Sequence, residues 1–324
     1  MAKNLKYIAL WLLVTLLASA CSKDGGDSNT VTKPNEAKKE IGIKPDVWKM
    51  AEGTTRTTFY TNSDLATFKC AAYNENTMTA YIVPVDVYKS GDNWIITGRP
   101  YYWPASGNLD FFGYMPATLP SYITAGPTYT ATSTPSITHT ISFTCSGLPM
   151  TNAGQGSSLK EFMFGMALGQ NGENAGSGVP LQFQHPFARI KLQLAASHPD
   201  ITINSITFKS IKNNGSYDHS ASPKWTTTGD ATNFVLSLTG DAADFDNNPA
   251  SEKQIGDYYI MIPQDWAGEI VVNANCLFWG EKKNYPSLTT TVPTNWQPGY
   301  SYTYTFNISP DDLIVNISKF TEQW

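Results

Sequence analysis

Apolar and polar residues alternate along short stretches of this sequence, and no other feature constrains the fold as much. Over residues 301–308, Tyr302, Tyr304, Phe306 and Ile308 alternate with smaller polar residues. A period of two is typical of a β-strand with one buried face. Similar apolar runs lie at residues 41–47, 81–87, 109–115, 141–145, 161–168, 183–194, 201–208, 234–238, 258–262 and 270–278. Because no stretch of ten or more residues has the period of an amphipathic helix, the sequence predicts an all-β fold.

The composition excludes several classes of protein. Of the 324 residues, 13% are aromatic and only 15% are charged, whereas disordered chains are rich in charge and poor in aromatic residues. The chain has 22 basic and 27 acidic residues, a net charge of −5, and no basic stripe that would bind phosphates. We therefore expect a folded protein that does not bind nucleic acid.

A glycine-rich stretch at residues 170–178 is the best candidate for a domain boundary. It is poor in apolar residues and separates two halves of about 150 residues each. The predicted segments are a signal peptide at residues 1–20, a lipidated linker at 21–38, and β-sandwich domains at 39–176 and 177–324. Just after the boundary, near residues 184–187, the apolar positions change parity. Because Pro186 has no N–H to donate, we expect a strand break or bulge there.

The N-terminus has the pattern of a lipoprotein export signal. Lys3 and Lys6 precede an apolar run at residues 8–17, and small residues then lead to Cys21. The run is too short for a permanent transmembrane helix. The segment resembles a bacterial lipobox, although Ala18 stands where an aliphatic residue is commoner. We therefore predict that the Cys21 thiol is acylated and anchors the chain in the outer membrane at the cell surface.

The other cysteines and the histidines form no recognisable catalytic or metal-binding motif. Cys70 and Cys145 could bridge within the first half, but the favoured interpretation is that these residues and Cys276 are single buried thiols. His185, which lies beside a proline among apolar residues, predicts a core or edge histidine bonded to the backbone. We expect no catalytic residue, no metal and no cofactor.

Several short motifs follow one another in a characteristic order. In the first half these are Tyr-Trp-Pro-Ala at residues 102–105 and Leu-Asp-Phe-Phe-Gly-Tyr-Met-Pro at 109–116. In the second half they are Phe-Gln-His-Pro-Phe-Ala-Arg-Ile at 183–190 and Trp-Gln-Pro-Gly-Tyr-Ser-Tyr-Thr-Tyr at 296–304. Together with the lipobox, these motifs resemble the fimbrillin family of Bacteroidota surface pilins, including its F-x-H-x-x-A and W-x-P-G-x-x-Y-x-Y signatures. The resemblance covers nearly the whole chain except residues 120–160.

The resemblance implies two tandem transthyretin-like β-sandwiches that assemble by donor-strand exchange. In that mechanism a protease removes the first strand, and a strand of the next subunit fills the vacated groove. Arg56 lies in a small polar stretch of the kind that proteases cut, so we expect cleavage between Arg56 and Thr57, with residues 41–47 as the removable strand. The candidate donor strand carries alternating apolar residues at Leu313, Val315 and Ile317.

Three functions remain open at this point. The first, which we expect, is a structural pilin subunit of a cell-surface fimbria, partnered by other pilin subunits and held in the outer membrane by the lipid on Cys21. The second is a fimbrial tip or lipid-anchored adhesin of the same fold that binds a glycan or protein of a host or bacterial surface. A cleft with an exposed tryptophan would favour it. The third is a carbohydrate-active enzyme or another hydrolase, which a cleft with two facing carboxylates would favour.

Overall fold

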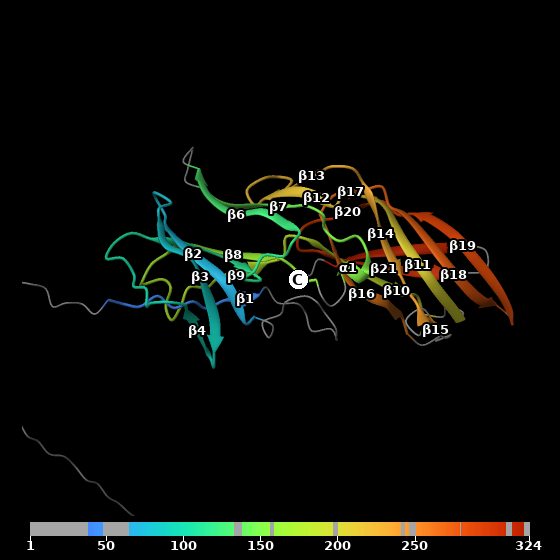
Figure 1. Cartoon of the computed structure of the whole chain (residues 1–324), viewed down its shortest axis with the longest axis horizontal. Helices are drawn as coiled ribbons and strands as arrows, with labels where there is room; N and C mark the ends of the chain where they lie inside the picture. Colours follow the sequence, from blue (N-terminus) through green and yellow to red (C-terminus); the bar gives the residue numbers. More distant parts are fainter. Residues whose placement is uncertain are drawn as a thin grey trace, which may run out of the picture. The chain divides into compact units, whose positions relative to one another are not determined.

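The part of the chain that the computed structural model describes is almost entirely β. It comprises residues 38–47, 65–132, 138–155, 159–196, 200–240, 244–245, 251–278, 280–308 and 313–320. Within these ranges the only α-helix is the single turn α1 (Asn152–Gln155) (Figure 1). The all-β prediction is therefore confirmed. Residues 38–324 form one compact unit.

The largest sheet has seven strands in the order β1-β9-β8-β5-β2-β3-β4. Their bounds are β1 (Asp46–Val47), β2 (Thr67–Asn74), β3 (Ala80–Ser90), β4 (Asn93–Ile96), β5 (Leu109–Met115), β8 (Met163–Gln170) and β9 (Gln182–Gln184). β1 runs parallel to β9, whereas every other neighbouring pair is antiparallel. The short first strand therefore lies at one edge of this sheet, and β5 lies at its centre.

A four-stranded sheet combines strands from both halves of the sequence, in the order β13-β12-β7-β6. The strands are β6 (Ile123–Thr132), β7 (Thr138–Cys145), β12 (Asn214–Asp218) and β13 (Trp225–Thr228). The hairpin of β12 and β13 joins the sheet because β12 pairs antiparallel with β7 (Figure 1). A hairpin from the second half of the chain thus extends a sheet that begins in the first half.

The remaining strands form three sheets, with the orders β16-β10-β21-β22, β14-β11-β18-β19 and β17-β20, and β15 also pairs with β11. The first contains β10 (Ala188–Leu194), β16 (Lys253–Met261), β21 (Ser301–Ile308) and β22 (Leu313–Phe320). The second contains β11 (Asp200–Ile211), β14 (Thr232–Ser237), β15 (Asp244–Phe245), β18 (Glu269–Phe278) and β19 (Glu281–Thr291). The third pairs β17 (Asp265–Trp266) with β20 (Thr294–Asn295).

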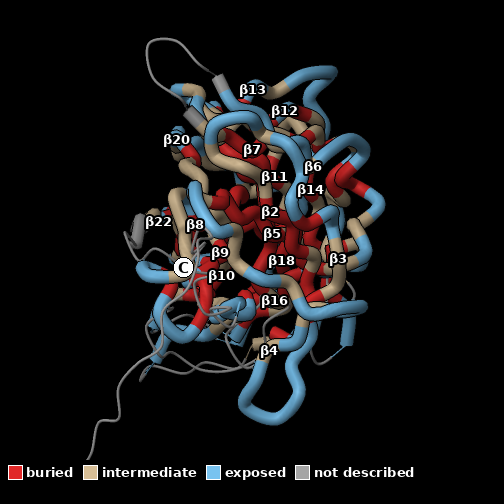
Figure 2. Tube along the Cα trace, turned by 90° about the vertical axis from the view of Figure 1, so that its left-hand side faces the viewer, coloured by how far each residue is buried: buried red, intermediate tan, exposed pale blue. Residues whose placement is uncertain are grey.

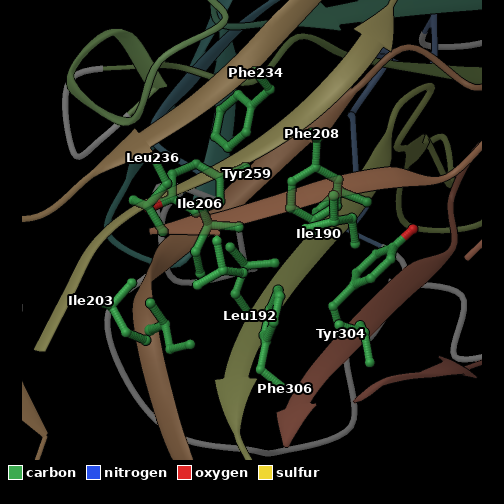
Figure 3. Close-up of a cluster of buried hydrophobic side chains, with 14 of the residues drawn as sticks. Ile190, Leu192, Ile203, Ile206, Phe208, Phe234, Leu236, Tyr259, Tyr304 and Phe306 are labelled. Atoms are coloured by element: carbon green, nitrogen blue, oxygen red, sulfur yellow. The ribbon is translucent and has the colours of Figure 1, made fainter. Parts of the chain in front are cut away.

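The C-terminal core is the cluster of buried apolar side chains between the first two of these sheets (Figure 3). Ile190 and Leu192 of β10 meet Ile206 and Phe208 of β11, and the Phe208 ring lies edge-on to that of Tyr304. The sequence predicted that Tyr302, Tyr304 and Phe306 face the second core, and all three belong to it. The large apolar side chains of β21 therefore lie on the face that we expected, and Ser301 and Thr303 on the opposite face are buried as well.

Two further clusters cover the two faces of the seven-stranded sheet. Figure 2 shows buried stretches of the chain at β2 and β5, in the middle of this sheet. We call the first cluster, which contains Phe68, Ile82, Phe111, Met163 and Phe183, the groove core. We call the second, which contains Ile141, Phe143, Phe164, Tyr217 and Ile260, the junction core. On β8 the adjacent residues Met163 and Phe164 are both fully buried, one in each cluster. The junction core also contains Ile260 of β16. Apolar packing is therefore continuous from the seven-stranded sheet to the sheet that contains β16.

The predicted strand break at Pro186 is confirmed, since β9 ends at Gln184 and β10 begins at Ala188. The predicted boundary between residues 176 and 177 stays a prediction. β9 lies beyond this boundary in sequence and yet pairs with β8, as the hairpin of β12 and β13 pairs with β7. Strands β9, β12 and β13 therefore place residues of the second half of the sequence in sheets that begin in the first half.

Candidate functional site: a groove that holds an N-terminal strand

The segment at residues 38–47 lies between two other stretches of the chain and bonds to both. On one side, Ile41 N donates to Tyr101 O at 2.7 Å, and Trp103 N donates to Lys39 O at 3.0 Å. A single antiparallel bridge joins Glu40 to Tyr102 between them. The first half of the segment is therefore paired as a strand would be, although only a bridge is formed.

The opposite wall of the groove is the stretch from Val179 to β9. Val179 N donates to Gly42 O at 2.8 Å, and Lys44 N donates to Val179 O at 2.8 Å. Asp46 N then donates to Leu181 O at 3.0 Å, where the parallel pairing of β1 with β9 begins. Residues 39–41 are thus hydrogen-bonded to one wall and residues 42–46 to the other, so the segment spans the groove between the two walls as an added strand does.

Apolar side chains of this segment form part of the groove core. Ile41, Ile43 and Val47 are 3%, 5% and 2% exposed, whereas Lys44 between them is exposed. They pack with side chains from β2, β3, β5, β8 and β9, among them Phe68, Ile82, Phe111, Met163 and Phe183. Burial of each such side chain contributes about 1.5–3 kcal/mol relative to exposure. The predicted inward alternation of residues 41–47 is therefore confirmed.

Two glycines allow the segment to approach its wall closely. A Cβ on Gly178 would lie 3.3 Å from both Lys44 N and Ile43 C, and one on Gly42 would lie 3.2 Å from Ser177 O. These neighbours are backbone atoms, which cannot rotate away as a side chain can. The fit between strand and wall therefore depends on the absence of side chains at these positions.

Replacing Gly178 with Val should weaken the docking of the segment by about 1–3 kcal/mol, because the new side chain meets backbone. The amide protons of Lys44 and Asp46, which bond to Val179 and Leu181, should then exchange with solvent roughly 5- to 150-fold faster. Hydrogen exchange read by NMR or mass spectrometry measures this. Ser177→Val is the matched control, since Ser177 is exposed. Equal exchange rates in the Gly178 variant and wild type would contradict the tight fit.

A cavity of about 690 Å³ lies at the start of the inserted segment. Its lining includes Ile41, Trp94, Arg99 and Tyr101. Arg99 is exposed, and its guanidinium carbon lies 5.3 Å from the centre of the Tyr101 ring. The cavity therefore adjoins the groove.

The candidate donor strand is β22, which in this structure is paired within its own chain. It pairs antiparallel with β21 from Leu313 opposite Ile308 to Phe320 opposite Ser301. Val315 is 7% exposed and belongs to the C-terminal core, against which Ile317 also packs. The residue between them on the other face, Asn316, is exposed. The structure thus has a strand at this position, with Val315 and Ile317 covering the C-terminal core, and donation of this strand stays a prediction.

The predicted lipidation and cleavage residues lie outside the described part of the chain. This holds for Cys21 and for Arg56 and Thr57. Val47 and Leu65 are the described residues on either side of residues 48–64, and both are buried in the groove core. The chain therefore leaves and re-enters the same core on either side of the predicted cleavage site.

Cysteine chemistry has no part in this site. Cys70, Cys145 and Cys276 are all buried and free, as the favoured interpretation of the sequence had it. Burial raises the pKa of the Cys70 and Cys145 thiols to about 12 and that of Cys276 to about 11. Each thiol therefore behaves as a small apolar side chain at neutral pH.

Two histidines lie beside carboxylates in the interior. His185 Nδ1 is 2.9 Å from Glu161 Oε2, and His139 Nε2 is 3.3 Å from Asp110 Oδ2. His185 is buried, as predicted, but no sequence signal pointed to Glu161 as its neighbour. Burial raises the pKa of Asp110, although an N–H from Gly169 and the nearby His139 oppose the rise. Across the described ranges no three His, Cys, Asp or Glu side chains gather to hold a metal ion.

The sequence profile that matches this chain is that of the Fimbrillin-like family, over residues 34–324. The chain belongs to this family. Membership confirms the resemblance read from the sequence motifs and makes the protein a fimbrial one, in a structural family rather than an enzyme family. It also implies a place in a cell-surface fimbrium among other fimbrial subunits.

Solved structures share the fold. A fimbrial protein from Bacteroides vulgatus aligns with a TM-score of 0.56 at 14% identity, over 87% of this chain and 99% of its own. A Bacteroides ovatus protein provisionally assigned to cell adhesion aligns with a TM-score of 0.54 at 17% identity, over 87% and 97%. A search among curated proteins finds no match. In the described residues, no helix has the length and apolar character needed to cross a membrane.

Proposed function

We propose that this chain is a structural pilin subunit that assembles by donor-strand exchange. It is exported as a lipoprotein, acylated on Cys21, and held at the outer membrane until a protease cuts between Arg56 and Thr57. Cleavage releases the segment that contains Ile41–Val47. The β22 strand of another subunit then enters the vacated groove.

The inserted N-terminal segment is the observation that carries this proposal. It is bonded to one wall over residues 39–41 and to the other over residues 42–46, and its apolar side chains are buried in the groove core. The chain on its C-terminal side contains the candidate cleavage site. Removal of the segment would leave two rows of backbone groups without partners, on Tyr101–Trp103 and on Val179–Phe183. It would also expose the groove core to water. Both costs favour the entry of another strand.

The candidate donor strand matches the groove in pattern. Leu313, Val315 and Ile317 repeat the spacing of two that places Ile41 and Ile43 in the groove core. Donation requires β22 to leave β21, so Val315 exchanges one apolar environment for another. Filling the groove breaks the pairing of β22 with β21 and uncovers part of the donor's C-terminal core, and the burial gained in the empty groove offsets this cost.

Replacing Cys21 with Ser should abolish acylation, because the hydroxyl of serine does not replace the thiol that accepts the lipid. We expect loss of palmitate labelling and at least a severalfold fall in fimbriae that contain this chain. Metabolic labelling and immunogold microscopy of whole cells measure the two effects. Cys70→Ser is the control, since that thiol is buried and free. Normal palmitate labelling of the Cys21 variant would contradict lipidation at this residue. If fimbriae from wild-type cells do not contain this chain, the pilin function is contradicted.

A further inference from the structure

A cleft of about 760 Å³ lies between the β12–β13 loop and the segments around β17 and β20. The residues that line it are distant in sequence from those of the groove. The volume of the cleft lies within the range of sites that bind small molecules. The charged, imidazole and amide side chains of its lining come from Lys212, His219, Lys224, Gln264, Asp265, Asn295 and Gln297. Neither the inserted strand nor β22 contributes to it, so it is separate from the assembly site.

The cleft concentrates positive charge on an acidic protein. The whole chain has a net charge of −5, but the cleft lining carries two lysines, Lys212 and Lys224, against one carboxylate, Asp265. That carboxylate already accepts a hydrogen bond from the side-chain amide of Asn295. The local charge therefore favours an anionic group.

Of the two lysines in the cleft, Lys224 is the one that a bound anion would stabilise more. Its ammonium is half-buried, and burial lowers its pKa. Its Nζ lies 3.5 Å from His219 Nδ1, and the Tyr217 hydroxyl lies 3.2 Å from the same nitrogen. Burial, and then the charge of Lys224, lower the pKa of His219 to about 4 against the opposing effect of Asp218. At neutral pH the ammonium therefore faces a neutral imidazole, and a carboxylate ligand would supply the missing countercharge.

The rest of the lining suits a ligand with hydroxyl groups. Trp225 and Trp296 are 5% and 1% exposed, so they form an apolar floor rather than a projecting platform. Their indole N–H groups already donate to Pro186 O at 2.6 Å and to Tyr304 Oη at 2.9 Å. Around this rigid floor lie serine and threonine hydroxyls and the amide of Gln297. Hydroxyls and amides over an apolar floor are complementary to a sugar ring.

We propose that this cleft binds a sugar unit that carries a carboxylate, with Lys224 and Lys212 meeting the carboxylate and the surrounding hydroxyls and amides meeting the ring. A uronic acid and a sialic acid share this chemistry. The site would give a subunit of the fibre affinity for acidic glycans. It does not depend on strand exchange, so either proposal can fail while the other holds.

Calorimetric titration of the purified, uncleaved subunit tests the site. The probes are methyl glucuronide, the methyl glycoside of N-acetylneuraminic acid, neutral methyl glucoside and sodium acetate. At least one acidic sugar should bind with a Kd of about 1 mM or below, and at least tenfold more tightly than methyl glucoside or acetate. The indole N–H signals of Trp225 and Trp296 should shift in NMR spectra during the same titration.

Lys224→Met should weaken the acidic sugar about tenfold or more, since it removes a charged hydrogen-bond donor and keeps the length of the side chain. Lys282→Met, which removes an exposed lysine from β19, should bind like wild type. If the Lys224 variant does not fold, Lys212→Met and Gln297→Ala take its place, and they should also weaken binding of the acidic sugar. The proposal is overturned if no acidic sugar binds, if neutral sugar or acetate binds as well, or if the folded cleft variants bind like wild type.

Discussion

Replacing Arg56 with Ala should abolish fibre formation and leave a stable, lipidated monomer. The inserted segment stays covalently attached in this variant, so it continues to fill the groove and to satisfy Tyr101, Val179 and Leu181. A donor strand could enter only by displacing a segment that is tethered and therefore present at a high effective concentration. Electron microscopy and gel filtration of surface extracts should show monomer and no fibres.

Arg99→Ala is the matched control for this variant. Arg99 is an exposed arginine beside the groove, so a protease that chose arginines by exposure alone would also cut there. We expect normal processing and normal fibres from this control. Fibres of normal length from Arg56→Ala would show that the chain assembles without removal of its first strand at this site.

Replacing Val315 with Asp should permit cleavage and block joining. In the monomer Val315 is 7% exposed in the C-terminal core, so an unpaired carboxylate there should lower the free energy of unfolding by about 2–5 kcal/mol. In the fibre the same carboxylate would have to enter the groove core. Denaturant unfolding measures the first effect, and fibre yield after cleavage measures the second.

Ile314→Asp separates loss of donation from loss of folding. Ile314 lies one residue away on β22 with 50% of its surface exposed, so its replacement should change stability by no more than about 0.5 kcal/mol. We expect fibres from this control. The Val315 variant keeps an intact groove, so it should still accept a wild-type donor and end growing chains. Long fibres of Val315→Asp alone would exclude β22 as the donor through this face.

Strands with a clear apolar pattern, alternating as in β21 or continuous as in β5, were predictable from the sequence, whereas β2 was not. β21 was read correctly because Tyr302, Tyr304 and Phe306 face the C-terminal core at every second position. β2 was missed because its buried residues Phe68, Cys70, Ala71 and Ala72 include small side chains and form neither a period of two nor a run of large apolar residues. This strand lies between β5 and β3 within a sheet that is covered on both sides, and there the period of two disappears.

The partners of the strands could not be read from the sequence. Periodicity gives the buried face of a strand but not its neighbour, so the pairing of β12 with β7 and of β9 with β8 was not foreseen. The same holds for Glu161, whose position beside His185 depends on contacts between distant segments. The burial of Ile41, Ile43 and Val47 and that of Val315 on β22 were foreseen, because each pattern is local in sequence. The docking of β22 on β21 depends on the tertiary fold.

The mass of the subunit in purified fibres tests the central claim most directly. The account predicts that intact-mass and N-terminal analysis of fibre subunits finds a chain that begins at Thr57 and lacks residues 38–47. Uncleaved chain should be found only in the monomer fraction, with lipid on Cys21. Fibre subunits that begin at Cys21 and retain Ile41, Ile43 and Val47 would contradict the account, because their groove would still hold its own first strand.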